Sequence, residues 1–467
     1  MINYTGTYTD QYQLTMAQAY FKQGKADDKA VFDYFFRKLP FDSGYAVFAG
    51  LNDLLDILEQ LHFDKKEIDY LKGLGFSDDF LDFLKNFRFR GKIFSSSEGD
   101  IVFPTRPVLQ VEATIIEAQL IETLLLNVLN FQTLIATKAS RMKLIAGEKQ
   151  LVDFGLRRAQ AAGGYYASKA AVAGGFNATS NVRAGMDFNI PVSGTMAHSF
   201  IQSYDDELSA FRAYAASYPD DCVLLVDTYD TLKSGVPNAI KTGKELEKKG
   251  HKLKGIRLDS GDLAYMAKES RRQLDEAGLD YVKIAASNQL DEQVIKSLME
   301  QNAPIDFFGV GTSLVTGNPD AALDGVYKLS YAGGKPRLKL SENVEKITLP
   351  HKKQVYRLIG TDGNFLGGDL VSLRDEEDIE EMFHPHIRDK SMNTENCQKE
   401  ALLKPVMEHG KRLKAGERLD EIAEFSQSQL KKLPDEYKRF TNPHIYKIGI
   451  SKALQKERNK LIEAHNQ

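Results

Sequence analysis

Hydrophobic and polar positions recur with two different periods along the first third of the chain. Apolar residues spaced three and four apart over 51–61, 65–73 and 78–87 predict amphipathic helices. The aromatic-rich run 31–37 has the composition of a strand. From 115 to about 146 a helical pattern continues without Pro or Gly, so we expect one long helix there. The N-terminal region is therefore expected to be α+β.

The middle of the chain has a different pattern, in which short apolar runs end in polar or glycine residues. The last four runs are about 25 to 30 residues apart, which is the size of one βα unit. The runs cover 151–155, 223–227, 255–259, 282–286 and 305–309. Successive βα units form a parallel sheet, either open or closed. A barrel distributes ligand groups over many strand ends, whereas an open sheet gathers them at one switch point. Because all five runs end in polar or glycine residues, we expect an α/β barrel.

These patterns divide the chain into three expected domains. An α+β domain is expected over 1–145, and the barrel that carries the active site over 146–325. Residues 326–467 are expected to form β-hairpins and a charged helical tail that packs back on the N-terminal domain. After about residue 395, the charge pattern favours a solvated outer layer.

Composition narrows the function classes. The 467 residues carry a formal net charge of −4 and only two cysteines. A nucleic-acid partner and an anionic membrane are not expected, and a disulfide framework and a Cys-rich zinc site are excluded. The N-terminal residues do not read as a signal peptide, and no apolar run approaches about 18 residues. We therefore expect a cytoplasmic protein, in which a local cluster of donors holds any anionic substrate.

Two strand ends have the features of phosphate cradles. Ser260 and Gly261 follow the run 255–259 and open a predicted helix, where backbone N–H groups and a hydroxyl can bind an anion. Gly309, Gly311 and Thr312 follow the run 305–309 and offer close backbone approach and a second hydroxyl. The alternatives are an ordinary acidic N-cap at the first position and a tight turn at the second.

Basic residues could complete an anion site. Arg157 and Arg158 lie just past a strand end, where adjacent guanidinium groups can clamp phosphate or pyrophosphate. The alternative is one surface arginine and one salt bridge. Lys138 and Arg141 are three apart on the preceding helix and share a face that could join this site or simply be solvated.

Two further residues could contact a ligand. Phe154 lies between an acid and a glycine at a strand end, where it could stack on an aromatic ligand or pack in the core. His198 follows the turn Ser193-Gly194-Thr195, which suits a second anion-binding loop, although a lone histidine is often structural. No Ser-His-Asp pattern, HExxH motif or Walker loop is visible. A site rich in phosphate donors with acids nearby suits phosphoryl or phosphoribosyl chemistry.

Six segments resemble the nicotinate phosphoribosyltransferase family and follow one another in family order. They are TDQYQLTM (9–16), TKASR (137–141), DFGLRRAQ (153–160), SGTMAHSF (193–200), LDSGDL (258–263) and GVGTSLVT (309–316). The resemblance implies a barrel of the quinolinate-phosphoribosyltransferase type with an α+β N-terminal domain, in a homodimer with shared active sites. It also implies formation of nicotinate mononucleotide and pyrophosphate from nicotinate and phosphoribosyl pyrophosphate, with ATP as a co-substrate.

The resemblance also assigns roles to individual residues. Phe154 would stack on the pyridine ring and Tyr12 would cover it from the neighbouring subunit, while Thr195 and Arg257 would hold nicotinate. The phosphoribosyl and pyrophosphate groups would lie against Arg157, Ser260, Gly261, Gly309, Gly311 and Thr312, with Lys138 and Arg141 as further candidates. Asp259 would lie near the ribose or a metal, and His198 matches the histidine that ATP phosphorylates. We expect Mg²⁺ on the leaving group and no metal held directly by the protein.

Two alternatives remain. In the related nicotinamide phosphoribosyltransferases an aspartate contacts the amide, and Ser180 stands at that position here when the segments are aligned by eye. A neutral serine tolerates a carboxylate, which an aspartate would repel, so nicotinate is favoured. The other alternative is a binding protein that has kept the ligand site but lost turnover.

Overall fold

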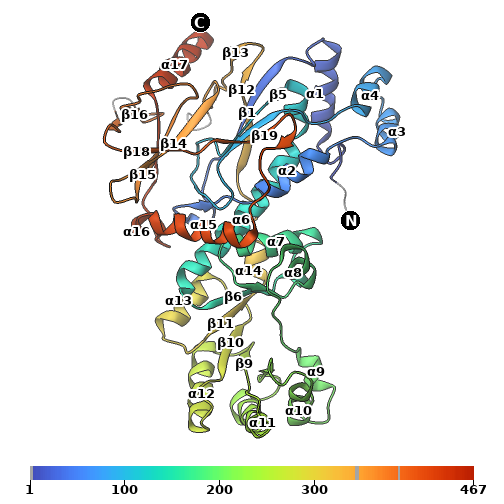
Figure 1. The fold of residues 1–467 in the computed structure, drawn as a ribbon, viewed down its shortest axis with the longest axis vertical. Coiled ribbons are helices and arrows are strands. Elements are labelled where there is room, and N and C mark those ends of the chain that lie inside the picture. The colour runs from blue at the N-terminus through green and yellow to red at the C-terminus, as the bar shows by residue number, and fades with distance from the viewer. Residues whose placement is uncertain (1–3, 342–346, 388–389, 467) are drawn as a thin grey trace. The chain divides into compact units, whose positions relative to one another are not determined.

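The computed structural model describes residues 4–341, 347–387 and 390–466, and it divides the chain into two compact units. Unit 1 comprises 1–134 and 322–467, and unit 2 comprises 135–321. Figure 1 labels their helices and strands. Within the described ranges, no helix is both long enough and apolar enough to cross a membrane.

Unit 1 is built on a seven-stranded antiparallel sheet in the order β13-β12-β1-β5-β3-β19-β20. Its strands are β1 (Lys29–Phe36), β3 (Lys92–Ser95), β5 (Leu109–Thr114), β12 (Gly325–Ala332), β13 (Lys335–Pro336), β19 (Lys404–Glu408) and β20 (Lys411–Arg412). The helices of its N-terminal segment are α1 (Gln11–Lys22), α2 (Leu51–Gln60), α3 (Lys65–Gly73), α4 (Asp78–Lys85) and α5 (Ile115–Leu120). These elements share one large apolar core.

A second sheet of unit 1 has six strands in the order β17-β16-β21-β15-β14-β18, and β2 (Ala46–Val47) pairs with β4 (Ile101–Val102). The six strands are β14 (Lys353–Ile359), β15 (Phe365–Leu373), β16 (Glu381–Phe383), β17 (Ser391–Asn393), β18 (Gln398–Ala401) and β21 (Lys447–Ile450). The last helices are α15 (Leu419–Lys432), α16 (Asp435–Lys438) and α17 (Lys452–Asn466).

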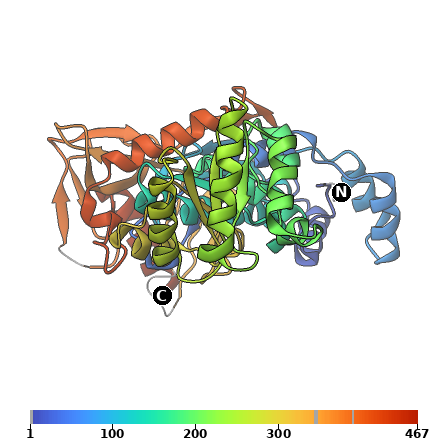
Figure 2. The ribbon, with the colours of Figure 1, turned by 90° about the horizontal axis from the view of Figure 1, so that it is seen from below.

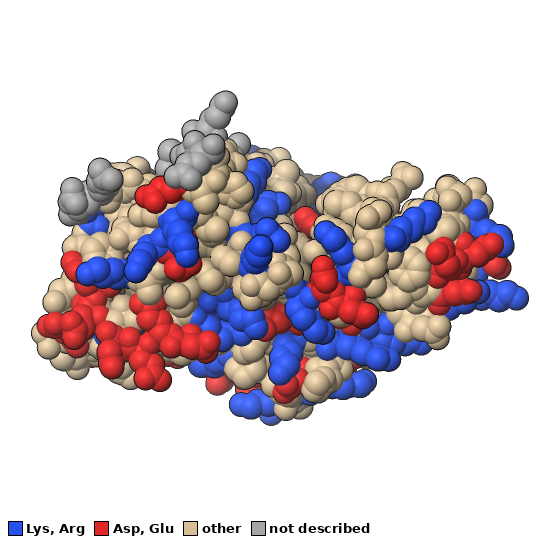
Figure 3. All heavy atoms as spheres, turned by 90° about the horizontal axis from the view of Figure 1, so that it is seen from above, with Lys and Arg blue, Asp and Glu red and all other residues tan. Residues whose placement is uncertain are grey.

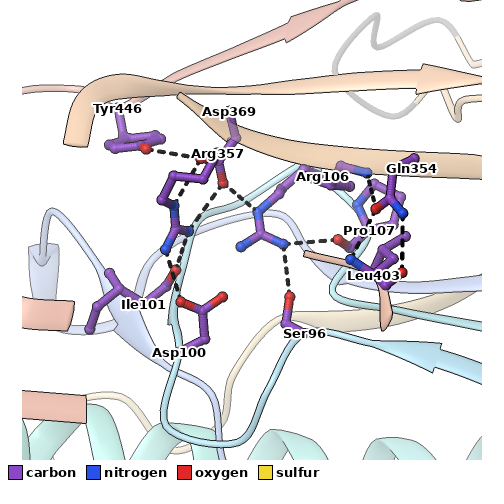
Figure 4. A network of polar contacts seen from close by, with 11 residues as sticks. Ser96, Asp100, Ile101, Arg106, Pro107, Gln354, Arg357, Asp369, Leu403 and Tyr446 are labelled. Atoms are coloured by element: carbon purple, nitrogen blue, oxygen red, sulfur yellow. Dashed lines mark hydrogen bonds and ion pairs between the residues drawn. The ribbon is translucent and has the colours of Figure 1, made fainter. Parts of the chain in front are cut away.

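A buried ionic network joins the N-terminal and C-terminal segments of unit 1 (Figure 4). Arg357 in β14 contacts Asp100 at 2.8 Å, and Arg106 contacts Asp369 of β15 at 2.8 Å. The hydroxyl of Tyr446 donates to Asp369 at 2.9 Å. Burial lowers the pKa of Arg106. Removing one partner would leave an uncompensated buried charge, which costs about 3–5 kcal/mol.

Two features of unit 1 differ from the sequence expectation. The helical stretch from 115 is interrupted at Ile121, so α5 is separate from the 25-residue α6 (Glu122–Ala146). The tail after 395 is not only a solvated helical layer, because β18, β19 and β21 pair within the two sheets. Leu403, Met407 and Ile450 are almost fully buried. The many charged residues of this segment made these short amphipathic strands look like a solvated helical tail in the sequence.

Unit 2 carries a six-stranded sheet in which every pairing is parallel, in the order β7-β6-β11-β10-β9-β8. The strands are β6 (Gln150–Asp153), β7 (Ala178–Thr179), β8 (Val223–Leu225), β9 (Gly255–Leu258), β10 (Lys283–Ser287) and β11 (Phe307–Val310). They confirm the predicted parallel α/β sheet, and each of the five apolar runs supplies one of them.

Helices follow most of these strands along the chain. They are α7 (Ala162–Ala173), α8 (Val182–Phe188), α9 (His198–Gln202), α10 (Glu207–Ser217), α11 (Val236–Lys248), α12 (Leu263–Glu276), α13 (Glu292–Glu300) and α14 (Thr312–Val315). Figure 2 shows α10, α11 and α12 side by side. Because the strands are parallel, their carboxyl ends meet at one edge of the sheet.

Candidate active site

A cavity of about 530 Å³ lies in unit 2 and is lined largely by residues at or beyond the carboxyl ends of its strands. Phe154 follows β6, Ser180 follows β7, and Asp259 follows β9. The complete lining is Phe154, Leu156, Arg157, Ser180, Val182, Val192–Ala197, His198, Leu225, Arg257 and Asp259. Seven residues predicted from the sequence therefore come together: Phe154, Arg157, Ser180, Thr195, His198, Arg257 and Asp259.

Phe154 is held against the adjacent strand β11 through both its backbone and its ring. Its backbone N–H donates to the carbonyl oxygen of Val310 at 2.8 Å. A Cβ on Gly309 would overlap the ring, so a glycine in β11 lets the ring lie against that strand. The structure thus gives Gly309 a packing role beneath the ring, and the phosphate contact assigned to it from the sequence stays a prediction.

Asp153 fixes the loop that carries Phe154. Its buried carboxylate accepts hydrogen bonds from Gly155 N at 2.7 Å, Ser168 Oγ at 2.7 Å and Thr179 Oγ1 at 2.8 Å. Its carbonyl oxygen accepts from Ser180 N at 2.8 Å. Burial raises the pKa of Asp153, although the donors from Ser168, Gly155 and Thr179 oppose the shift. Asp153 therefore connects the two ring-binding candidates, Phe154 and Ser180.

Arg257 is at the centre of the polar wall of the cavity. Its Nε donates to Ser287 Oγ at 2.8 Å, its Nη1 to Thr195 Oγ1 at 3.0 Å, and its Nη2 to Asp259 Oδ1 at 3.1 Å. The guanidinium carbon lies 5.3 Å from the centre of the Phe154 ring. These bonds fix the plane of the guanidinium with three of its five N–H groups, so two remain that can donate to a ligand.

His198 lies between a hydroxyl and a carboxylate. Its Nδ1 is 3.0 Å from Thr228 Oγ1, and its Nε2 is 3.8 Å from Asp259 Oδ2. The histidine is the first residue of the short helix α9, and its side chain is 41% exposed. A reagent in the cavity can therefore reach the ring, while both of its nitrogens are oriented by neighbours.

At the first predicted phosphate cradle, the structure shows the acidic N-cap that the sequence offered as the alternative, and phosphate binding by Ser260 and Gly261 stays a prediction. Asp262 caps α12 and accepts from the N–H groups of Ala264 and Tyr265, both at 3.1 Å. Ser260 Oγ donates to Asp227 Oδ2 at 2.5 Å. Ser260 and Gly261 are exposed but do not line the cavity. The helix N-terminus is therefore already satisfied by its own carboxylate.

The other predicted anion-binding residues lie outside the cavity lining. Gly311 caps α14, and Thr312 is exposed at its first position. Lys138 and Arg141 are buried and bind Glu292, at 2.5 Å from Lys138 Nζ and 3.3 Å from Arg141 Nε. Burial is the largest cause of the lowered pKa of Lys138. Their face of α6 is thus buried rather than solvated. Tyr12 lies on α1 in unit 1 and is 49% exposed.

Several residues of the site were not assigned from the sequence. Asp227 accepts from Asp259 N at 3.0 Å and from Ser260, and its Oδ1 has no hydrogen-bond partner in the described structure. Ser287 and Thr228 complete the contacts of Arg257 and His198. The position of Asp227 at the end of an apolar run was the available signal, because the run 255–259 likewise ends in an aspartate, Asp259, that lines the cavity. The side chains Val182, Val192 and Met196 form an apolar wall.

The described residues contain no group of three or more His, Cys, Asp or Glu side chains that could hold a metal ion. The site therefore consists of an aromatic ring, two arginines, a reachable histidine and a carboxylate at the edge of a parallel sheet. This combination of side chains at the carboxyl edge of a parallel sheet is typical of the active sites of α/β enzymes.

Comparisons with known proteins specify the family. Three family models match: the nicotinate phosphoribosyltransferase N-terminal domain over 7–130, the nicotinate phosphoribosyltransferase family over 149–360, and the C-terminal domain over 352–458. The nicotinate phosphoribosyltransferase of Bacillus subtilis is 45% identical over 454 residues, covering 95% of this chain and 92% of the relative. That of Dictyostelium discoideum is 38% identical, covering 96% of this chain and 87% of the relative.

Solved structures agree with the sequence matches. The human nicotinic acid phosphoribosyltransferase superposes with a TM-score of 0.88 at 31% identity, covering 97% of this chain and 99% of that one. A nicotinate-nucleotide pyrophosphorylase from Pyrococcus furiosus gives a TM-score of 0.71 at 26% identity, covering 91% of this chain and 95% of that one. The chain belongs to the nicotinate phosphoribosyltransferase family, whose reaction is a step of NAD biosynthesis by salvage of nicotinate.

Proposed function

We propose that the unit 2 cavity joins nicotinate to phosphoribosyl pyrophosphate and couples this reaction to ATP hydrolysis, which makes the chain a ligase that forms a C–N bond. The arrangement of Arg257 is the observation that carries the proposal. It lies above the Phe154 ring and is fixed by Thr195, Ser287 and Asp259. A pyridine ring against Phe154 would bring its carboxylate to the remaining N–H groups of Arg257.

The reaction forms a bond from the pyridine nitrogen to the anomeric carbon of the ribose and breaks the bond from that carbon to pyrophosphate. Positive charge develops on the sugar and negative charge on the leaving group, so the enzyme needs positioning and fixed charges. Asp259 supplies a carboxylate for the sugar side, and the exposed Arg157 supplies a cation for the pyrophosphate. No protein nucleophile attacks the sugar.

Mg²⁺ fits the donor set on the acidic side of the cavity. Mg²⁺ is usually held by one or two carboxylates together with substrate phosphates and water. Asp259 lines the cavity, and the adjacent Asp227 has a buried carboxylate oxygen without a hydrogen-bond partner in the described structure. When bound, the ion would neutralise charge on the leaving pyrophosphate. Asp259 and Asp227 would then hold its waters rather than form a complete protein site.

ATP coupling is assigned to His198. An unprotonated ring nitrogen would attack the γ-phosphorus of ATP, forming an N–P bond as the bond to ADP breaks. The contacts with Thr228 and Asp259 orient the ring for this step. Later hydrolysis of the N–P bond would release phosphate and restore the histidine. The new negative charge could draw Arg157 towards the site and change the affinity for phosphoribosyl pyrophosphate.

The sheet of unit 2 is proposed to form an α/β barrel of the quinolinate-phosphoribosyltransferase type. Its strand order is cyclic: β6 pairs with both β7 and β11, and β8 to β11 follow one another. A doubly wound open sheet instead reverses direction at a switch point. Thr179 of β7 also forms a parallel bridge to Val192, so pairing of the segment around Val192 with β8 would complete the ring.

A homodimer with shared sites, located in the cytoplasm, completes the proposal. Large apolar side chains at the cavity rim are exposed, with Val182 at 69%, Val192 at 51% and Leu156 at 43%. Such a patch favours an interface. Tyr12 of a second subunit is the proposed cover for the bound pyridine ring, in keeping with its own exposure.

The experiment is a turnover assay with nicotinate or nicotinamide as acceptor, each with and without ATP. We expect nicotinate mononucleotide to be the product and ATP to stimulate its formation. Ser180 lines the cavity and carries no charge to repel a carboxylate. Preferred use of nicotinamide would transfer the assignment to the nicotinamide phosphoribosyltransferases. Equal rates with and without ATP would remove the coupling from the proposal.

A further inference from the structure

A second cavity, larger than the catalytic one, lies in unit 1 and contains none of the motif residues. Its volume is about 760 Å³, within the range of about 300–1,000 Å³ that is usual for ligand pockets. It is formed around the strands β1, β3 and β5 and the segment after α4. Unit 1 therefore has room for a ligand of its own.

The lining of this cavity is basic, although the whole chain has a net charge of −4. It includes five Lys or Arg residues (Lys29, Arg88, Arg90, Lys92 and Lys352) and three Asp or Glu residues (Asp27, Glu112 and Glu117), together with His409. Figure 3 shows one face of the space-filling structure, on which Lys and Arg side chains lie among Asp and Glu side chains. A cavity with this excess of cations favours an anionic ligand.

Protein contacts already use two of the three acids. Glu112 binds Lys352 at 2.8 Å and also binds Arg374. Glu117 accepts from Arg90 N at 3.0 Å and from Thr114 N at 3.0 Å, as the N3 residue of the capping box of α5. Glu112 is therefore neutralised by its two cations, whereas the donors to Glu117 are neutral and leave its negative charge in place. Asp27 and Glu117 would both oppose a bound anion, but five Lys or Arg side chains against three acids keep the lining net positive.

Three of the cations make no ion pair within the described part of the chain: Lys29, Arg88 and Arg90. Lys92, by contrast, binds Glu408. All three are exposed, and Arg88 Nη1 donates to the carbonyl oxygen of Phe87 at 2.6 Å. Two guanidinium groups two residues apart, with a lysine nearby, can bind a phosphate group in bidentate fashion.

Aromatic side chains supply the rest of the lining. Phe83 and Tyr331 are partly buried there, and Phe87 is almost fully buried. An aromatic wall beside unpaired guanidinium groups suits a ligand with a flat base and a chain of phosphates. We propose that this cavity is a second binding site, distinct from the catalytic cavity, for a nucleoside polyphosphate.

The test uses ADP as the probe, with adenosine and inorganic pyrophosphate as the two partial ligands. Binding is measured by titration calorimetry on the full chain and on Arg88→Ala/Arg90→Ala. The matched control is Lys65→Ala/Lys66→Ala, which removes two exposed positive charges from α3 in the same unit. We expect the first variant to lose one ADP site or at least about tenfold in its affinity. The control should bind as the wild type does.

A photoreactive azido analogue of ADP then locates the site by mass spectrometry of labelled peptides. Labelling should fall within 83–92, 112–117 or 325–337, and Arg88→Ala/Arg90→Ala should reduce it. Label confined to unit 2 peptides, or equal ADP binding by all three proteins, would overturn the proposal. If pyrophosphate bound as tightly as ADP, the proposal that the ligand carries a nucleoside would be overturned. Melting temperatures within the error of the wild type would show that both variants are folded.

Discussion

The Nη1 atom of Arg257 lies 3.0 Å from the Oγ1 atom of Thr195, so a residue of β9 and the loop before α9 meet at the wall of the cavity. Because Ser287 and Asp259 hold the other nitrogens, the guanidinium is oriented before a ligand arrives. Such preorganisation lowers the cost of binding a carboxylate.

Replacing Arg257 with alanine should therefore impair the use of nicotinate. Loss of one charge-assisted hydrogen bond costs about 1.5–3 kcal/mol, which corresponds to about a 10- to 150-fold loss in kcat/KM for nicotinate. Arg212→Ala is the control, since Arg212 is half-exposed and binds Glu245 away from the cavity lining. Steady-state kinetics with nicotinate as the varied substrate would measure the effect. A wild-type KM and kcat in Arg257→Ala would contradict the assignment.

Gly309→Ala should displace the Phe154 ring. A Cβ at this position would overlap the ring, and overpacking of this kind costs about 1–3 kcal/mol. We expect a raised KM for nicotinate and a lower melting temperature. Gly73→Ala is the matched control, because a Cβ there has no heavy atom within 4 Å and the glycine is helical. Identical kinetics for the two variants would show that the ring does not need this contact.

Asp153 should make the stability of the protein depend on pH. Its pKa is raised in the folded protein by burial, so folding favours the protonated carboxyl. The unfolded state loses its proton at lower pH, and stability therefore falls as pH rises from about 3.8 to the higher folded pKa. The amide of Asp153→Asn does not titrate, so the stability of this variant should lack the fall that the Asp153 carboxyl group causes. Melting temperatures of both proteins from pH 4 to pH 7 would test it, and parallel curves would contradict it.

The βα pattern predicted the sheet of unit 2 and placed Phe154, Arg157 and Asp259 at the edge where parallel strands end. Ser180, Thr195 and Arg257 have no such pattern and were assigned through the family resemblance. The sequence did not predict that Asp262 would cap α12, because an acid after a Ser-Gly turn is compatible with either a cap or a phosphate site. Lys138 and Arg141 contact Glu292, which is about 150 residues away in the sequence. No local pattern of hydrophobic and polar residues indicates such a contact. The strands of the charged tail were missed because each is only two to five residues long.

Subunit complementation tests the proposed dimer. If Tyr12 of one subunit covers the ring in the other, Tyr12→Ala and His198→Asn chains should each have low coupled activity. A mixed dimer would then contain one site with both residues intact, and about a quarter to a half of the activity per dimer should return. Co-expression with two affinity tags would isolate the mixed dimer. Purified mixed dimers without restored activity would indicate that each site is formed by one chain.

His198→Asn is the decisive variant for ATP coupling. Asparagine keeps a polar group near Thr228 and Asp259 but has no ring nitrogen to accept a phosphoryl group. We expect ATP hydrolysis to be abolished, while slow synthesis continues without ATP because the sugar chemistry needs no phosphohistidine.

The matched control is His251→Asn, because His251 lies outside the cavity lining and contacts Asp220 at 2.8 Å. Incubation with γ-labelled ATP should leave acid-labile, base-stable label on the wild type and the control but not on His198→Asn. Equal labelling of all three proteins, or ATP stimulation that survives in His198→Asn, would exclude His198 as the phosphoryl acceptor.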